Sequence, residues 1–198
     1  MSVDAKLVKE LKDISGAGMM DCKKALEESG CNLEEALKWL RERGVKVAAK
    51  KAGREAKEGL VASYIHTGSK LGVLVEINCE TDFVARTDEF RKFGHELAMH
   101  IAASSPEAVS KENLSPELIE REKEIYRAQL VETGKPANII DKIIEGKLEK
   151  YFEEACLLEQ EWIHDAEAGK VRDVLTSIIA RVGENVVIRR FARFSIGT

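Results

Sequence analysis

Three segments with the alternating apolar and polar pattern of β-strands constrain the fold of this chain most strongly. Two of them, residues 59–66 and 70–80, are separated by a Thr-Gly-Ser sequence that suits a hairpin turn. The third, residues 184–195, follows a long stretch of mainly helical periodicity. A hairpin and one returning strand make a small sheet, so we expect an α+β fold with helices packed on a three-stranded antiparallel sheet.

Both faces of the expected sheet carry large apolar side chains. In the last strand, strict alternation places Ile188 and Phe194 on one face and Val187 and Phe191 on the other. Helices can cover only one face of a three-stranded sheet that is built in this way. We therefore expect another surface to cover the second face.

The first 44 residues have the apolar spacing of three short helices. Gly16, Gly30 and Gly44 mark the expected breaks between these helices, and Gly30 and Gly44 suit left-handed C-terminal caps. Asn32 and Glu35 resemble a capping box at the start of the third helix. We expect a three-helix domain over residues 1–44, similar to a ubiquitin-associated fold, which is more typical of a recognition module than of a catalytic scaffold.

Residues 45–57 form a basic segment between this domain and the expected α+β core over residues 58–198. The segment has five basic side chains against one acidic one, and we predict a helical linker. Two interpretations are open: a solvated connector, or an element that contacts phosphates. The whole chain has 31 Lys and Arg residues against 35 Asp and Glu, a net charge of -4, so we expect no direct nucleic-acid partner and no membrane binding.

The sequence lacks the patterns of a secreted, membrane-spanning or disulfide-rich protein. Its N-terminal residues are amphipathic and charged, and no apolar run approaches the roughly 18 residues of a membrane span, so we expect a cytoplasmic location. The four cysteines lie far apart, without a Cys-x-x-Cys pair or a histidine at zinc-finger spacing. We expect free thiols.

No motif in the sequence supplies a catalytic, metal or cofactor site. His95 and His100 are five residues apart, whereas the histidines of a helical zinc-protease motif are four apart and share one face. The Gly-Ala-Gly sequence at residues 16–18 links two predicted helices, so it does not match a dinucleotide-binding loop, which follows a strand. A Gly-x-Ser-x-Gly nucleophile elbow is absent. The sequence therefore favours a non-catalytic binding protein that needs no cofactor.

Residues 78–86 leave a predicted strand and enter a predicted helix. Thr81 or Asp82 suits the N-cap of that helix, which places Phe83 in its first turn. Two interpretations of Phe83 are open. It is either an exposed side chain on a protruding corner, or a core residue with Asp82 as a simple cap.

Two longer motifs resemble the signatures of the elongation factor Ts family. The first is Leu-Val-Lys-Glu-Leu at residues 7–11 with Gly-Ala-Gly-Met-Met-Asp-Cys-Lys-Lys-Ala-Leu at 16–26, and the second is Glu-Ile-Asn-Cys-Glu-Thr-Asp-Phe-Val-Ala-Arg at 76–86. Residues 48–53, 156–160 and 189–194 resemble further segments of the family. The likeness covers essentially the whole chain.

This resemblance implies a guanine nucleotide exchange factor that acts in polypeptide chain elongation. Members of the family bind the GDP form of the GTPase elongation factor Tu and speed the release of its nucleotide. They use the segment that corresponds to Thr81–Val84 to disturb magnesium coordination. By this likeness, Phe83 wedges between helices of the partner while Asp82 perturbs the nearby magnesium and nucleotide.

The resemblance also implies how the partner is held. The three-helix domain of the family docks on the G domain of the partner, which implies contacts from Met19 and Met20 and a further one from Lys12. The family usually has Arg at the position of Lys12, and the two side chains do not bind carboxylates or phosphates alike.

The chain resembles the short members of the family rather than the long ones. Long members carry a second copy of the sheet subdomain, whereas this sequence has one set of three strands. In the short members two subunits supply the paired sheets. We therefore expect a homodimer that forms through the sheet face with Val187 and Phe191.

Three other functional classes stay open. A helical adaptor would bind its partner through residues 1–44 alone. An RNA-associated factor would depend on Lys50, Lys51 and Arg54 in the basic segment. An enzyme without a recognisable motif would show turnover that is unaffected by changes at Asp82 and Phe83.

Overall fold

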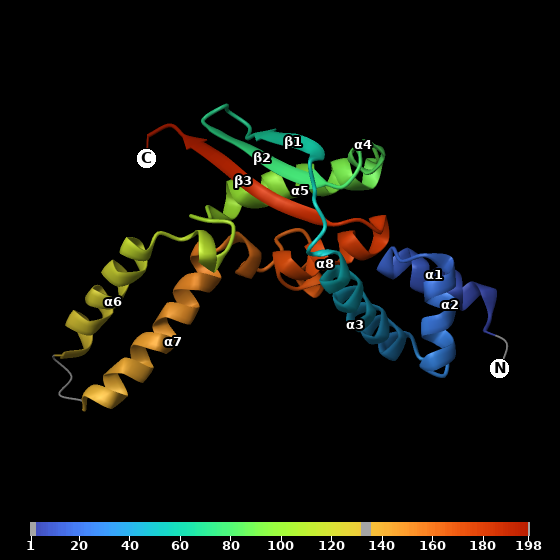
Figure 1. Cartoon of the computed structure of the whole chain (residues 1–198), viewed down its shortest axis with the longest axis horizontal. Coiled ribbons are helices and arrows are strands. Elements are labelled where there is room, and N and C mark those ends of the chain that lie inside the picture. Colours follow the sequence, from blue (N-terminus) through green and yellow to red (C-terminus); the bar gives the residue numbers. More distant parts are fainter. Residues whose placement is uncertain (1–2, 132–135, 198) are drawn as a thin grey trace. The chain divides into compact units, whose positions relative to one another are not determined.

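The computed structural model describes residues 3–131 and 136–197, and it has the α+β fold that the sequence predicts (Figure 1). Within this part of the chain, eight α-helices and three strands follow in the order α1-α2-α3-β1-β2-α4-α5-α6-α7-α8-β3. The chain forms two compact units. Residues up to 60, 77–93 and 173–187 make the first unit, and residues 61–76, 94–172 and those from 188 onward make the second.

Three N-terminal helices form a small bundle in the first unit, as expected. They are α1 (Ala5–Ser15), α2 (Met19–Glu28) and α3 (Leu33–Lys51). The Asn32 side chain accepts a hydrogen bond from the backbone N–H of Glu35 at 3.1 Å, which confirms the predicted N-cap of the third helix. The buried core of the bundle consists of Val8, Leu11, Cys22, Ala25, Leu26 and Ala36.

The prediction that the third helix ends at Gly44 is wrong, because α3 continues to Lys51. Gly44 is buried, and a Cβ atom at this position would lie 3.7 Å from the Cβ of Ala180 and 3.8 Å from the Cγ2 of Thr176. Both neighbours belong to α8 (Val171–Val182). Both distances are ordinary van der Waals contacts, so a Cβ atom would fit between the two helices. The first half of the predicted basic linker extends α3.

All three predicted strands are present and form one antiparallel sheet in the order β1-β2-β3. They are β1 (Glu58–Ile65), β2 (Leu71–Cys79) and β3 (Val186–Ser195). Four alternate residues of the central strand are buried, namely Val73, Val75, Ile77 and Cys79. Figure 1 shows α5 (Asp88–Ser104) running along one face of the sheet, which accounts for the burial of that face.

The alternation of more buried and more exposed residues along β3 changes phase in the middle of the strand. Val186 and Ile188 are buried, but Arg189 and Arg190 are both exposed. Two consecutive residues on one side of a strand are the arrangement that a β-bulge produces. The expected strict alternation, which placed Ile188 and Phe194 on one face, is therefore wrong.

Arg190 and Arg193 show on which face of the sheet the residues at this end of β3 lie. The Arg190 Nε donates to the Glu76 Oε2 of β2 at 2.7 Å, whereas the Arg193 guanidinium donates to the backbone oxygen of Ala102 in α5 at 3.3 Å. Arg193 thus lies on the helix-covered face, and Phe191, two residues before it, shares that face. Phe194 lies on the open face and is 66% exposed.

Two long helices in the second unit, α6 (Pro116–Val131) and α7 (Ala137–Ala155), form a hairpin (Figure 1). Leu130, Ile144 and Leu148 form its buried core. Three short 3-10 turns, Lys111–Asn113, Leu157–Glu159 and Ala166–Ala168, connect the remaining segments. In the described part of the chain, no helix combines the length and apolar character that crossing a membrane requires.

His100 on α5 is fully buried within a polar network of the second unit. The backbone N–H of Ile163 donates to its Nδ1 at 3.4 Å, so the ring proton resides on Nε2, which donates to the Gln160 Oε1 at 3.0 Å. The Gln160 amide nitrogen in turn donates to the backbone oxygens of Ser104 and Glu154. The ring also stacks on Trp162. Burial lowers the pKa of His100, because the charged form of the ring would lose its hydration there.

We expect stability to fall in mild acid because of His100. Its pKa in the unfolded chain is near the ordinary 6.5 and is lower in the folded protein, so the unfolded chain binds the proton first. This contribution is complete above about pH 6.5 and is lost as the pH falls below that value. Thermal unfolding of His100→Gln should show a lower melting temperature at pH 8 but a weaker dependence on pH. An unchanged pH dependence would contradict this role for His100.

Candidate partner-binding site

The segment after β2 forms a sharp corner in the first unit. Thr81 has extended backbone angles and caps the four-residue helix α4 (Asp82–Ala85), because its Oγ1 accepts a hydrogen bond from the backbone N–H of Val84 at 3.4 Å. Cys79 and Ala85 are buried on either side of the corner. The predicted cap at the strand-to-helix junction is therefore confirmed, with Thr81 as the N-cap.

Phe83 projects from this corner with 80% of its surface exposed. No other large hydrophobic side chain among the described residues is as exposed. Of the two interpretations that the sequence left open, burial in the core is therefore wrong. A phenylalanine left in water forgoes about 1.5–3 kcal/mol of burial energy, which a partner that covers it can recover.

Asp82, beside Phe83, is a partly exposed acidic group on the same corner. Its Oδ2 lies 2.9 Å from the Arg86 Nη2, one turn along the chain. The Arg86 side chain is 74% exposed and that of Asp82 is 46% exposed, so solvent screens the pair and it contributes little stability. The carboxylate remains accessible to a partner.

The carboxylates of Glu184 and Glu80 make hydrogen bonds that connect the backbone just before Phe83 to the segment that leads into β3. The Glu184 Oε2 accepts hydrogen bonds from the backbone N–H groups of Glu80 at 3.1 Å and Thr81 at 3.0 Å. The Thr81 hydroxyl donates to the Glu184 Oε1 at 2.7 Å. In return, the Glu80 Oε1 accepts a hydrogen bond from the backbone N–H of Asn185 at 2.6 Å, which lowers the pKa of Glu80.

Cys79 is a structural thiol at the base of the corner. Its Sγ donates to the backbone oxygen of Thr81 at 3.1 Å. Burial, together with the negative charge of Glu184, raises the pKa of Cys79 to about 11. The group is therefore a protonated donor at neutral pH rather than a thiolate nucleophile.

A second exposed surface lies at the junction of α1 and α2, also in the first unit. Met19 and Met20 begin α2 and are 56% and 77% exposed, and Lys12 in the last turn of α1 is exposed as well. The structure thus brings the three predicted docking residues together at one end of the helical bundle. Ile14, which the sequence analysis did not select, adds a further exposed apolar side chain there.

The α1–α2 junction packs on the Arg181 side chain of α8. Gly16 ends α1 with φ of 65°, and a Cβ at this position would lie 3.1 Å from the Arg181 Cδ. The Arg181 Nε is 2.9 Å from the Glu89 Oε1 at the start of α5. Glycine suits this position, because it adopts the left-handed backbone without strain and leaves room for the Arg181 side chain of α8.

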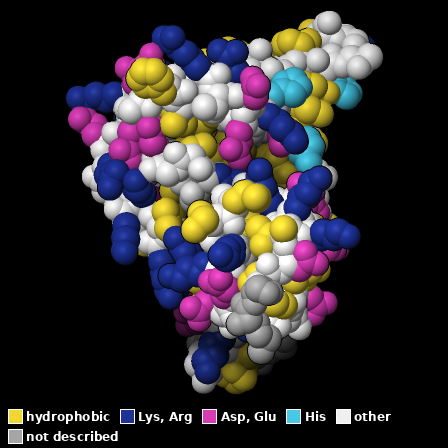
Figure 2. Space-filling view, turned by 90° about the vertical axis from the view of Figure 1, so that its right-hand side faces the viewer, with side chains coloured by type: hydrophobic (Ala, Val, Ile, Leu, Met, Phe, Trp, Pro, Cys, Tyr) yellow, Lys and Arg dark blue, Asp and Glu magenta, His cyan; other side chains and the backbone are white. Residues whose placement is uncertain are grey.

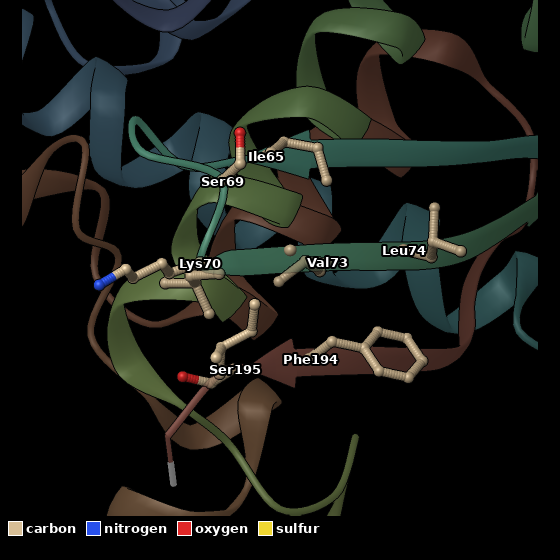
Figure 3. A pocket seen from close by; sticks show the side chains of 10 residues that line it. Ile65, Ser69, Lys70, Val73, Leu74, Phe194 and Ser195 are labelled. Atoms are coloured by element: carbon tan, nitrogen blue, oxygen red, sulfur yellow. The ribbon is translucent and has the colours of Figure 1, made fainter.

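The open face of the sheet is a third apolar surface, in the second unit. Its exposed apolar side chains are Val61, Ile65, Leu74, Phe194 and Ile196. Figure 3 shows Ile65, Leu74 and Phe194 around a shallow hollow, to which Gly72 contributes no side chain. A patch of this kind on a protein surface is typical of an interaction site.

The residues predicted for a dimer contact, Val187 and Phe191, are both only partly exposed. Because of the change of phase in β3, the two do not share a face. Phe194 is the exposed aromatic residue of the open face. The sequence does not indicate that Phe194 lies on the open face, because the pattern of strict alternation carries no signal for a bulge.

Two cations of the basic segment are engaged within the first unit. The Lys51 Nζ donates to the backbone oxygen of Gly183 at 2.6 Å, and the Arg54 Nη1 lies 3.4 Å from the Glu80 Oε2. These contacts make the end of the segment a structural connection rather than a free solvated linker. Lys50 is exposed.

Histidine side chains gather on one part of the surface in Figure 2. The Tyr64 hydroxyl lies 2.9 Å from the His66 Nδ1, and the Tyr64 ring packs edge-on against His95. His164 bonds to the backbone oxygen of Glu96. Across residues 3–131 and 136–197, no group of three or more histidine, cysteine or acidic residues is placed to hold a metal ion.

Comparison with known proteins identifies the family of this chain. The family model described as elongation factor TS matches residues 5–169. The chain is 58% identical over 195 residues to elongation factor Ts of Caldanaerobacter subterraneus subsp. tengcongensis, covering 98% of this chain and 97% of the relative. It is 56% identical over 195 residues to that of Thermosipho melanesiensis, covering 98% and 99%, and 56% identical over 197 residues to that of Geobacter sulfurreducens, covering 100% and 91%.

Matches of this length and identity place the chain among the protein factors of translation elongation. Within that class, the chain belongs to the elongation factor Ts family.

The exposure of Phe83 gives a direct prediction for stability. Phe83→Ala should change the free energy of unfolding by less than about 0.5 kcal/mol, because the side chain makes little contact with the folded protein. Phe90→Ala, a matched change at a fully buried position of α5, should cost about 3–5 kcal/mol. Urea unfolding of both variants checks this, and equal losses would show that Phe83 is a core residue.

Proposed function

We propose that this chain is a guanine nucleotide exchange factor for elongation factor Tu, acting in the cytoplasm during polypeptide chain elongation. It binds the GDP form of that GTPase and speeds the release of the nucleotide. The observation that carries this proposal is the 80% exposure of Phe83 on a corner whose backbone is held by buried and charged contacts. Membership of the elongation factor Ts family supports it.

In this proposal, Phe83 inserts between helices of the partner near its magnesium site. Burying one phenylalanine supplies about 1.5–3 kcal/mol, and each tenfold weakening of nucleotide binding requires about 1.4 kcal/mol. Phe83 therefore accounts for one to two orders of magnitude in nucleotide affinity, and the rest of the interface supplies the remainder.

Asp82 acts beside Phe83 through its charge. When the corner docks, its carboxylate approaches a site at which magnesium and phosphate groups bind each other. A negative charge there competes for the cation and repels the phosphates. By linkage, bound GDP weakens the binding of this chain by the same factor, so the exchange factor is released when a new nucleotide binds.

The α1–α2 junction provides the second contact with the partner. Met19 and Met20 are flexible apolar side chains that suit a shallow groove between helices, and Lys12 adds a positive charge at the edge of this surface. Release of the nucleotide by this mechanism depends on binding energy alone. It requires no acid, base or nucleophile from this chain, so we propose a non-catalytic factor that needs no cofactor.

We further propose that two copies of the chain form a homodimer through the open faces of their sheets. The exposed apolar side chains on this face are those that a second sheet would cover. Phe194 and Leu74 would lie at the centre of this contact and Val187 at its border, whereas Phe191 lies on the helix-covered side. Charged groups on the same face, Glu76 and Arg190, already pair with each other.

The exchange activity is tested by release of a fluorescent GDP analogue from purified elongation factor Tu. We expect fast release with the wild-type chain, and a loss of about 10- to 100-fold in kcat/KM for Phe83→Ala, since the burial energy of the side chain is removed. Asp82→Ala should also slow release.

Ile139→Ala, a change at an exposed apolar residue of α7, is the matched control and should retain full activity. No acceleration by the folded wild-type chain would refute the proposed function. Acceleration that both corner variants retain would place the site elsewhere.

Sedimentation velocity at micromolar concentration tests the homodimer. The wild-type chain should sediment at twice the mass of the 22.0 kDa monomer. Phe194→Glu should sediment as a monomer with unchanged helix content, because a charge on an exposed apolar position disrupts the contact but not the fold. A monomeric wild-type chain would refute this part of the proposal.

A further inference from the structure

The corner that carries Phe83 has little intrinsic stability. Helix α4 has only four residues, and an isolated helix of that length does not persist in water. Its first turn has a single side-chain cap, the long 3.4 Å hydrogen bond from the Val84 N–H to the Thr81 Oγ1. The direction in which Phe83 points therefore depends on contacts from outside residues 81–85.

Glu184, at the start of the segment that leads into β3, supplies the strongest of these contacts. One of its oxygens accepts the N–H groups of both Glu80 and Thr81, and the other accepts the Thr81 hydroxyl proton at 2.7 Å. Hydrogen bonds to a carboxylate are roughly twice as strong as those between neutral groups. The same carboxylate thus fixes the peptide backbone before α4 and the rotamer of its N-cap.

The connection is reciprocal. Glu80 accepts the N–H of Asn185 at 2.6 Å, while the Asn185 Nδ2 donates to the backbone oxygen of Arg54 at 2.7 Å. Asn185 is buried, so these bonds are shielded from water. We call Glu80, Glu184 and Asn185 the corner clamp. It joins three segments that lie far apart in the sequence.

We propose that the corner clamp sets the direction of the Asp82–Phe83 corner for nucleotide exchange, with Glu184 as its main positioning residue. Glu184 acts through the backbone of Glu80 and Thr81. This inference rests on the proposed exchange function and adds to it a group outside the signature segment. The clamp determines how well a docked corner distorts the nucleotide site, whereas docking itself depends on the α1–α2 junction.

This division of roles predicts a specific kinetic signature. Glu184→Ala should lower the maximal rate of GDP release, kcat, by about tenfold and change the KM for GDP-bound elongation factor Tu by less than about threefold. Glu184→Gln should retain most of the activity. Its amide oxygen can accept both N–H groups while its amide nitrogen donates to the Thr81 Oγ1.

Glu55→Ala is the matched control for the lost charge. Among the ion pairs of residues 3–131 and 136–197, Glu55 takes part only in the one with Lys57, and both side chains are about three-quarters exposed. This variant should behave as the wild type. If Glu184→Ala does not fold, Thr81→Val replaces it, because this change removes the hydroxyl that Glu184 binds and keeps the shape of the side chain.

Amide hydrogen exchange of the free full-length protein gives a readout that does not depend on the partner. In Glu184→Ala, the amides of Glu80 and Thr81 should exchange at least about tenfold faster, while those of α1, α2 and α3 keep their protection. In Glu184→Gln both sets should remain protected.

Three results would overturn the clamp. The first is wild-type kcat in folded Glu184→Ala, the second is unchanged exchange at the two amides, and the third is equal impairment of Glu184→Gln and Glu184→Ala. Failure of the proposed function has a different outcome, because the wild-type chain itself would then not release GDP from its partner. The amide measurement would still decide the clamp in that case.

Discussion

An exposed phenylalanine can act as a defined contact only where the backbone beneath it is fixed, and here the Glu184 carboxylate supplies that constraint. It binds two consecutive N–H groups and the hydroxyl of the N-cap residue Thr81. Without it, a helix of four residues would not hold Phe83 in one direction. Because Phe83 is 80% exposed, the free energy that its burial would supply does not stabilise the folded chain.

The first compact unit gathers the parts that this contact needs. Gly44 of α3 lies beside Ala180 and Thr176 of α8, and Gly16 places the α1–α2 junction against Arg181 of the same helix. The segment that follows α8 carries Glu184, which reaches the corner. The bundle with Met19 and Met20, and the corner with Phe83, are therefore both built on α8 and its C-terminal extension.

Much of the fold is predictable from sequence because its signals are local. The strands and the N-cap at Asn32 follow from neighbouring residues alone. The sequence does not locate the end of α3, because a glycine inside a helix and one at a helix C-terminus look alike in sequence. The predicted alternation of faces along β3 is wrong from Arg189 and Arg190 onward. The role of Glu184 has no signal in the sequence, since its hydrogen-bond partners are more than 100 residues away. The sequence alone also leaves the burial of Phe83 open, because exposure depends on how the chain folds around the residue.

Site-specific photocrosslinking tests the central claim, that Phe83 is the contact with the GTPase. A photoreactive benzoylphenylalanine placed at position 83 should crosslink to GDP-bound elongation factor Tu, within its nucleotide-binding domain. The same group at position 194, on the open face of the sheet, should crosslink to a second copy of this chain. Crosslinks to the GTPase from position 194 and none from position 83 would contradict the account.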